Sequence, residues 1–344
     1  MDSLAINGSC SRSNYNAIDA AKLLMSICVV AIHTKPLIHC SNQVVLKSFE
    51  TFFSLAVPFF FIASGFFLGQ KLKYANPTDG YHDLKPILQN LKKNISMYLL
   101  WTVIYLPLTI AGFRLWDDSP IEAIIKFIRN LFIVGENYNS WILWYLLSTI
   151  YALLYVYLML KRGASVNSIT ILGFVIFVAS LFITRLSVYE GELSGLLNLL
   201  QKVISVTIKD GRIFKGLFFI PLGLLFATKQ LPSFRIGIVL FFGGFLLTYF
   251  TSGIISGVSV SICSAGLFVT VANLNLPSST IYPKLRSIST DIYLLHMIVF
   301  SVYYQLRYGR STFGVDCFIF TVFASIICSL LLTVFRKRKR LFQS

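Results

Sequence analysis

The sequence contains little charge and still less acid. Only 13% of its 344 residues are charged, 56% are hydrophobic, and 30 lysines and arginines face 14 aspartates and glutamates. A soluble domain carries about 25% charged residues. This scarcity excludes a soluble enzyme and predicts an all-α, polytopic membrane bundle.

The alternating apolar and polar residues that a membrane β-barrel requires are also missing. The apolar runs are near-continuous and about 18 to 22 residues long, which is the length of a helix that crosses a bilayer. The net charge of +16 does not indicate nucleic-acid binding. The basic residues lie mostly in short loops beside apolar runs, as in membrane proteins. We therefore expect a lipid bilayer, and no nucleic acid, as a partner.

The six cysteines lack the spacing of a metal site. Cys10 and Cys40 are expected on opposite sides of the membrane, so we expect no disulfide framework and no metal centre. Residues 1–15 are polar and lack the apolar core of a cleavable signal, so we expect the first span to be retained. The other cysteines fall in predicted spans, where they act as small apolar packers: Cys28, Cys263, Cys317 and Cys328.

About ten apolar stretches qualify as transmembrane helices, and no linker or repeat divides them. They form one predicted domain over residues 1–344, with a basic cytoplasmic tail at 336–344 that binds lipid headgroups. The stretches 120–134 and 194–208 are amphipathic and are expected at the membrane interface. The predicted spans are 17–36, 51–69, 95–113, 141–160, 167–185, 213–229, 235–252, 254–274, 287–306 and 313–335.

The loop charges predict an orientation. The loops after the second, fourth, sixth and eighth spans, together with the tail, hold more lysine and arginine than the opposite loops. Because these residues accumulate on the cytoplasmic side, both termini are predicted to be cytoplasmic. Lys22 then lies in the inner half of the bilayer and His33 lies toward the outer surface.

Lys22 and His33 stand eleven residues apart within the first span. That spacing is three helical turns plus about 20°, so both lie on one helix face, roughly 16 Å apart along the axis. Ser26 falls on the same stripe, and Asp19 lies near it. Ionisable residues at membrane depth usually line a protein interior, a cavity or a pathway.

Each of these two residues admits several roles. A neutral imidazole at His33 can take a proton from a hydroxyl, which is the task of a general base in acyl transfer. It can equally be an interfacial histidine bonded to a neighbouring helix. Lys22 can hold a phosphate or carboxylate, pair with Asp19, or extend to the headgroups.

The ninth span carries a second polar stripe. Ser289, Tyr293 and His296 are spaced i, i+4 and i+7 and share one face, whereas Asp291 points to nearly the opposite face. The stripe either shapes a cavity or forms hydrogen bonds between helices.

Three further segments place polar residues near the membrane. Residues 57–66 include Pro58, Ser64 and Gly65, which indicates either a kinked, closely packed helix or a substrate path. Trp144 begins the fourth span and belongs either to a cavity or to an interfacial aromatic belt. Arg212 precedes the sixth span and faces either a polar cavity or headgroups.

Together and in this order, these segments resemble the acyltransferase 3 family of polytopic membrane proteins. The first helix of that family carries an acidic residue, an arginine three residues later, then ten residues and a histidine. Asp19, Lys22 and His33 match this pattern. The other matching motifs are residues 57–66, the tryptophan motif at 143–146, the phenylalanine–glycine span at 216–223, and Ser289, Tyr293 and His296.

The resemblance implies an integral O-acyltransferase that moves an acyl group, commonly acetyl, from acyl-CoA to a hydroxyl of a cell-envelope glycan or related acceptor. Acyl-CoA is then a co-substrate rather than a bound cofactor, and the expected location is the cell membrane. His33 and Lys22 are implied to be catalytic, with Lys22 replacing an arginine that serves the donor. The implied cavity residues are Asp19, Ser26, Ser64, Trp144, Arg212, Ser289, Tyr293 and His296.

Within that family, residues 30–34 and 56–61 are similar to the membrane half of the serine racemases of vancomycin resistance. No pyridoxal-dependent racemase half is recognised in this sequence, so we expect no racemase activity. Lysine at position 22 cannot make the planar two-point contact of a guanidinium. The sequence therefore also admits a non-enzymatic transporter or exporter of a small solute or polysaccharide that uses the same cavity.

Overall fold

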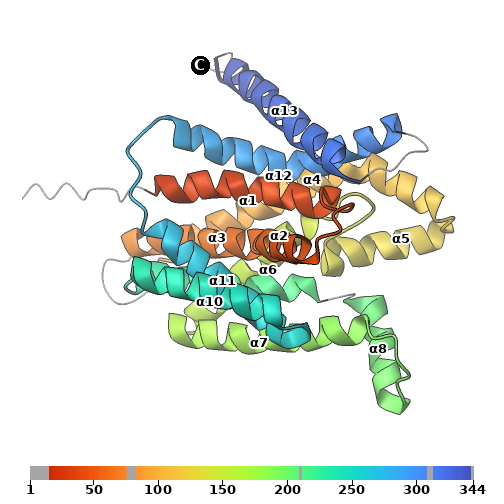
Figure 1. Ribbon diagram of the computed structural model, residues 1–344, viewed down its shortest axis with the longest axis horizontal. Helices are drawn as coiled ribbons and strands as arrows, with labels where there is room; N and C mark the ends of the chain where they lie inside the picture. The colour runs from red at the N-terminus through yellow and green to blue at the C-terminus, as the bar shows by residue number, and fades with distance from the viewer. Residues whose placement is uncertain (1–14, 76–82, 209–210, 308–312, 342–344) are drawn as a thin grey trace, which may run out of the picture.

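A computed structural model describes residues 15–75, 83–208, 211–307 and 313–341 of the protein. Within these ranges the chain is helical and has no β-strand, as the sequence predicts (Figure 1). The elements are α1 (Asn16–Thr34), α2 (Gln43–Ser54), α3 (Ala56–Ala75), α4 (Lys85–Leu115), α5 (Pro120–Arg129), the π-helical turn η1 (Asn130–Val134), α6 (Leu143–Lys161), α7 (Val166–Ser187), α8 (Gly195–Thr207), the 3₁₀ turn η2 (Arg212–Lys215), α9 (Gly216–Thr228), α10 (Phe234–Phe250), α11 (Gly253–Ala272), α12 (Ile281–Leu306) and α13 (Val315–Leu341).

The fold is a polytopic helical membrane bundle. In the described part of the chain, 8 helices are long and apolar enough to cross a membrane, and α2 with α3 forms one of them over 31 residues. The two other predicted spans correspond to α9 and α10, which have 13 and 17 residues. At 1.5 Å per residue α9 covers about 20 Å, less than the roughly 30 Å of a hydrocarbon core. The prediction of about ten spans therefore holds only when these short helices are counted.

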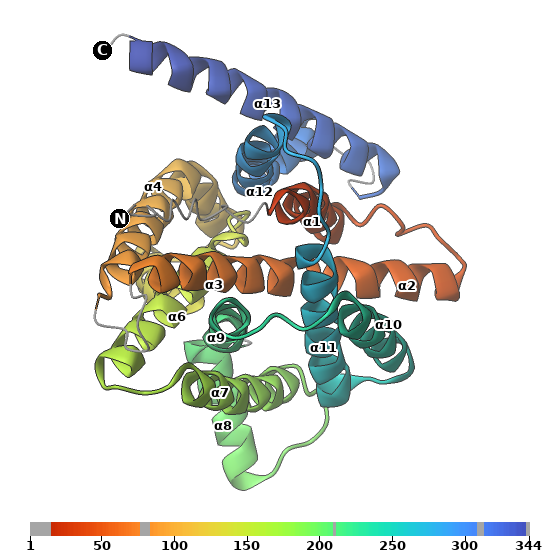
Figure 2. The same cartoon turned by 90° about the vertical axis from the view of Figure 1, so that its left-hand side faces the viewer.

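The α2–α3 segment crosses the middle of the bundle. Figure 2 shows α1, α12 and α13 on one side of it and α7, α9, α10 and α11 on the other. The start of α1 and the end of α13 lie at the same end of the molecule (Figure 1). The cytoplasmic location of both termini stays a prediction.

Glycine allows α3 and α9 to pack backbone against backbone. A Cβ atom added at Gly65 would collide with the carbonyl oxygen of Ile220, and one added at Gly223 would collide with the carbonyl oxygen of Ile62. Small residues at such crossings let membrane helices approach closely. The Ser-Gly motif in α3 thus forms a tight helix crossing, one of the two roles that the sequence admits for it.

Three helices begin earlier than the sequence analysis predicts. The segment 43–50, predicted as loop, is the first part of α2, which the Asn42 side chain caps by accepting hydrogen bonds from the next backbone N–H groups. α4 begins at Lys85 rather than 95, and α12 begins at Ile281 rather than 287. The first turns of these helices are polar, so hydropathy alone predicts loops there. The correction places Lys93 and Arg286 on helices.

The start of the predicted tail belongs to the bundle. Arg336 lies in α13, and its guanidinium donates hydrogen bonds of 3.0 and 3.1 Å to the carboxylate of Asp291. Ser329 donates a third hydrogen bond to that carboxylate. Asp291 is 4% exposed and faces α13, on the side opposite the Ser289 stripe, as the helical spacing predicts. Residues 342–344 of the predicted tail lie outside the described residues.

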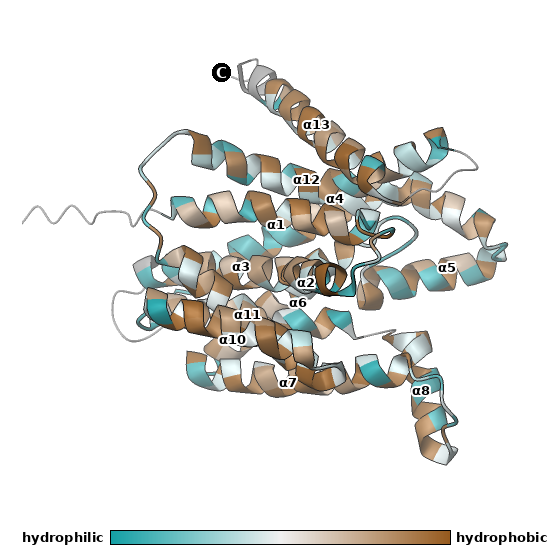
Figure 3. Cartoon of the chain, viewed as in Figure 1, coloured by the Kyte–Doolittle hydropathy of each residue, from teal (hydrophilic) through white to brown (hydrophobic). Residues whose placement is uncertain are grey.

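The two amphipathic stretches form helices that the bundle does not bury. α5 and α8 contain no buried residue, and each shows an apolar and a polar side (Figure 3). Ser119 begins α5 with a capping box that includes Glu122. Arg129 joins the two helices by donating a hydrogen bond of 3.0 Å to the carbonyl oxygen of Val206. Their position at the membrane interface stays a prediction.

The described cysteines carry free thiols. Cys28, Cys263 and Cys317 are buried, as expected of apolar packers, and Cys328 is partly buried. Cys10 lies outside the described residues.

We expect Gly65→Ala to destabilise the bundle, because the added methyl group forces α3 away from α9. Overpacking of this kind typically costs about 1–3 kcal/mol. Gly243→Ala in α10 is the matched control, since a Cβ there meets no atom within 4 Å. The control should be neutral or up to about 1 kcal/mol more stable. Thermal unfolding of the purified variants in detergent measures both changes, and equal midpoints would contradict the packing account.

Candidate active site

Two separate cavities contain Lys22 and His33. The first, of about 280 Å³, has a lining that includes Lys22, Lys71, Asn90, Lys93, Arg286 and Ser289, and we call it the Lys22 cavity. The second, of about 310 Å³, has a lining that includes His33, Ser54, Trp144, Arg212, Lys215 and Ser261, and we call it the His33 cavity.

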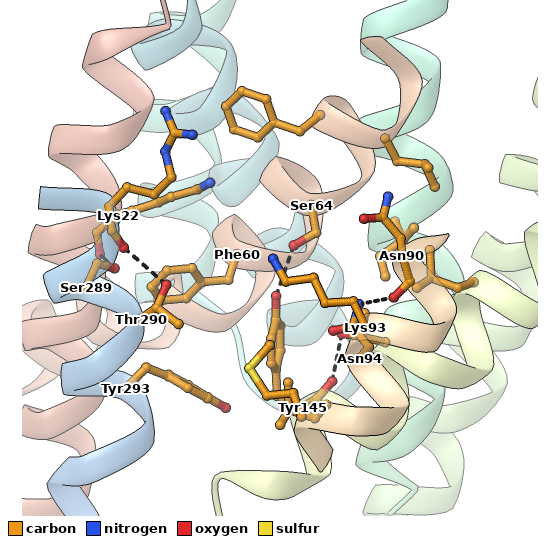
Figure 4. Close-up of a pocket in the computed structure, with 18 of the residues that line it drawn as sticks. Lys22, Phe60, Ser64, Asn90, Lys93, Asn94, Tyr145, Ser289, Thr290 and Tyr293 are labelled. Atoms are coloured by element: carbon orange, nitrogen blue, oxygen red, sulfur yellow. Dashed lines mark hydrogen bonds between the residues drawn. The ribbon is translucent and has the colours of Figure 1, made fainter. Parts of the chain in front are cut away.

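Cations surround the Lys22 cavity. Figure 4 shows the side chains of Lys22, from α1, and Lys93, from α4, reaching into it from different sides. The Lys22 ammonium lies 4.3 Å from the centre of the Phe67 ring, which gives it a cation–π contact. Lys71 and Arg286 complete the set of cations. The cavity is therefore suited to a ligand with several negative charges.

An ion pair with a buried carboxylate holds one side of this cavity together. Asp19 is 2% exposed, and its carboxylate accepts two hydrogen bonds from the Arg286 guanidinium, the Nε bond being 2.8 Å long. Ser289 donates a hydrogen bond of 2.9 Å to the carbonyl oxygen of Lys22. Both contacts fix α12 against α1. Asp19 thus pairs with Arg286 rather than with Lys22, and the Lys22 ammonium extends into the cavity.

Two rings enclose His33 in the last turn of α1. Its imidazole stacks on Trp141, with ring centres 5.8 Å apart, and lies 5.4 Å from the ring of His296. His33 also lines its cavity, so one side of the imidazole is accessible to a ligand there. This is the placement that a general base requires.

Arg212 reaches the His33 cavity from η2. Its guanidinium lies 6.0 Å from the centre of the Trp144 ring and 3.6 Å from the carboxylate of Glu136. Ser148 anchors η2 to α6, because its hydroxyl donates to the carbonyl oxygen of Ile213 at 2.6 Å. That hydroxyl also accepts the backbone N–H that follows η2. Arg212 thus lines a cavity, which is one of the two positions that the sequence admits for it.

Aromatic rings separate the two cavities. Tyr293 lines both of them, and its hydroxyl donates a hydrogen bond of 2.7 Å to the carbonyl oxygen of Ile142. Phe60 and Tyr145 lie 5.9 and 5.4 Å from the Tyr293 ring, centre to centre. Ser64 shares a hydrogen bond of 3.1 Å with the Tyr145 hydroxyl. We call Phe60, Tyr145 and Tyr293 the aromatic junction.

The structure changes the grouping of the predicted catalytic pair. Lys22 and His33 share a helix face, as their spacing predicts, but they line different cavities. The structure therefore does not bring the two side chains together, and the catalytic role of each stays a prediction. Ser26 is fully buried and donates to the carbonyl oxygen of Leu23, so it lines neither cavity. His296 is fully buried behind His33.

Several cavity residues escaped the sequence analysis. Arg286 stands three residues before Ser289, so helical spacing would have placed it on the same stripe had α12 been predicted to begin earlier. Lys93 and Asn90 were missed for the same reason in α4. Among the residues that the structure describes, no group of three or more His, Cys, Asp or Glu side chains is arranged to hold a metal ion.

A family model described as an acyltransferase domain matches residues 15–334. The chain belongs to the acyltransferase 3 family. The resemblance seen in the sequence motifs is thereby confirmed.

Two bacterial relatives match part of this chain. A serine/alanine racemase of Enterococcus gallinarum is 31% identical over 124 residues, which are 36% of this chain and 17% of the racemase. An amino-acid racemase of Enterococcus faecalis is 27% identical over 130 residues, which are 38% of this chain and 17% of that protein. Because the matches span so little of each relative, their racemase activity is not transferred to this chain. No solved structure matches this chain significantly.

Proposed function

We propose that this protein is a membrane acyltransferase, which takes its acyl group from acyl-CoA and transfers it to a hydroxyl group. The proposal rests on two cavities of different character that share Tyr293. One is lined by cations from four helices, and the other contains an imidazole able to act as a base. Such a division suits a reaction between an anionic donor and an uncharged hydroxyl.

The Lys22 cavity is the proposed donor site. CoA carries several phosphate charges, and lysine ammonium groups bind phosphate as point charges. Lys22, Lys71 and Lys93 supply such groups, and the side chains of Asn90 and Asn94 add amide donors from successive turns of α4. Lys22 then binds the donor, as the arginine that it replaces is thought to do, but without a bidentate contact.

The His33 cavity is the proposed acceptor site. His33 takes the proton from the acceptor hydroxyl as its oxygen attacks the thioester carbonyl carbon. The carbon–sulfur bond then breaks, and the CoA sulfur leaves with the proton that His33 returns to it. Arg212, in the same cavity, offsets the negative charge that develops on the carbonyl oxygen.

The thioester must pass the aromatic junction to reach His33. Lys22 and His33 are roughly 16 Å apart along α1, a span that the extended arm of CoA can bridge. Tyr293 closes the passage in this structure, since its hydroxyl is bonded to the carbonyl oxygen of Ile142. Rings packed this closely favour a small acyl group, and we propose acetyl.

The proposed acceptor is a cell-envelope glycan or a related hydroxyl compound. The proposed location is the cell membrane, with both termini cytoplasmic, because the basic loops gather at the end of the bundle that holds the Lys22 cavity. The donor then binds from the cytoplasm, where acyl-CoA is made. The His33 cavity faces the outer side, where envelope glycans are exposed.

We expect His33→Ala and His33→Gln each to lower acyl transfer by about 10²- to 10⁴-fold, the usual contribution of a general base. Glutamine forms hydrogen bonds but accepts no proton at neutral pH, so it separates a base from a structural histidine. Acyl transfer is measured as the radiolabel that appears in the envelope fraction after membrane vesicles are incubated with radiolabelled acetyl-CoA. His39→Gln is the control, since His39 is exposed and lines neither cavity.

Native activity in His33→Gln would show that His33 is structural. The wild-type protein could also transfer no acyl group from any CoA donor and yet move a solute in proteoliposomes. In that case the transporter hypothesis would replace the enzyme hypothesis.

We expect Lys22→Met to raise the KM for acetyl-CoA by about 10- to 100-fold, because one charge-assisted contact to the donor is lost. Lys22→Arg should keep or improve the wild-type KM. Lys73→Met is the control. Lys73 is an exposed lysine two residues after Lys71 in α3 and does not line the Lys22 cavity, so its loss should leave KM unchanged. Steady-state kinetics at fixed ionic strength measure all three. A wild-type KM in Lys22→Met would mean that Lys22 only extends to the headgroups.

A further inference from the structure

The protonation of the His296 ring follows from its hydrogen bonds. Its Nδ1 atom lies 3.1 Å from the carbonyl oxygen of Ile292 and 2.9 Å from that of Tyr293. A carbonyl oxygen only accepts hydrogen bonds, so Nδ1 carries the hydrogen and donates it. In a neutral imidazole the other nitrogen, Nε2, is then an acceptor with a lone pair.

That lone pair is buried and unused within the described residues. The His296 side chain is fully buried, and Nε2 has no hydrogen-bond partner among them. A buried polar atom without a partner is costly, and such atoms are rare outside functional sites. A hydrogen-bond donor that approaches Nε2 would therefore remove this cost.

His33, whose ring lies beside that of His296, can serve as this donor. The centres of the two imidazole rings are 5.4 Å apart, and the ring planes are inclined by 36°. Trp141 stacks on His33 at 5.8 Å and confines its ring to this neighbourhood. A small rotation of His33 that turns its edge toward His296 brings an N–H group within hydrogen-bond reach of Nε2.

We propose that His296 is the positioning residue of His33. It accepts a hydrogen bond from one nitrogen of His33 and so leaves the lone pair on the other nitrogen, which faces the acceptor hydroxyl. This inference rests on the proposed function of His33 as the base. It deepens that function, because it assigns the tautomer that makes His33 competent.

The proton balance stays within His33. The hydroxyl proton passes to the free nitrogen of His33, and the same proton later moves to the CoA sulfur. His296 keeps its own proton on Nδ1 throughout. While His33 is an imidazolium, its N–H continues to donate to His296, which steadies the charge as the carboxylate of a hydrolase triad does, but without a negative charge.

Two substitutions separate positioning from packing. His296→Leu fills a similar volume but removes the acceptor. His296→Gln keeps both functions of the imidazole, since its amide N–H₂ can donate to the helix carbonyls and its amide oxygen can accept from His33. If His296 were purely structural, there would be no reason for His296→Gln to keep activity that His296→Leu loses.

The first readout does not depend on acyl transfer. The chain has four histidines, so ¹⁵N-histidine labelling of the full protein in nanodiscs gives few signals, and His33→Gln assigns the one of interest. We expect a single neutral tautomer for His33 in the wild type and in His296→Gln, and a mixture of both in His296→Leu. A mixture already present in the wild type would overturn the proposal, even if the leucine variant fails to fold.

The second readout is kinetic. We expect His296→Leu to lower kcat for transfer from acetyl-CoA by about 10- to 100-fold with KM for the donor within twofold, and His296→Gln to stay within about fivefold of the wild type. Equal kcat values in the two variants, or a raised KM with normal kcat, would overturn the positioning role. An inactive wild type with a single His33 tautomer would instead refute the proposed function and leave the hydrogen bond between the rings standing.

Discussion

The ion pair between Asp19 and Arg286 determines how α12 lies against α1, and both cavities depend on that contact. Because Asp19 is buried, its charge requires the two hydrogen bonds that Arg286 supplies. Ser289 adds a bond to the Lys22 carbonyl oxygen and fixes the same register. In this register Lys22 lines the Lys22 cavity near the start of α1, and His33 lies beside His296 near the end of α1.

The central position of α3 gives the site its two-part form. Gly65 brings α9 against α3, and Phe60, five residues earlier, meets Tyr293 in the aromatic junction. The same helix therefore closes the bundle and lies between the Lys22 cavity and the His33 cavity. Under the proposed function, this division keeps water from the thioester until the acceptor is in place.

Helical periodicity predicted much of this arrangement. It placed Lys22 and His33 on one face and Asp291 away from the Ser289 stripe, because residues three, four and seven apart share a helix face whatever surrounds them. It did not show that Lys22 and His33 occupy separate cavities, since the neighbours of each turn are set by tertiary packing. The polar first turn of α12 hid Arg286, because hydropathy marks the part of a helix inside the membrane and not its ends.

The central claim is that the acyl group crosses from the Lys22 cavity to the His33 cavity. Inverted membrane vesicles, with the cytoplasmic face outward, test it when radiolabelled acetyl-CoA is added outside only. The account predicts labelled ester that an added, impermeant esterase reaches only after the vesicles are permeabilised. Ester removed by the esterase from intact vesicles would place donor and acceptor on the same side and contradict the account.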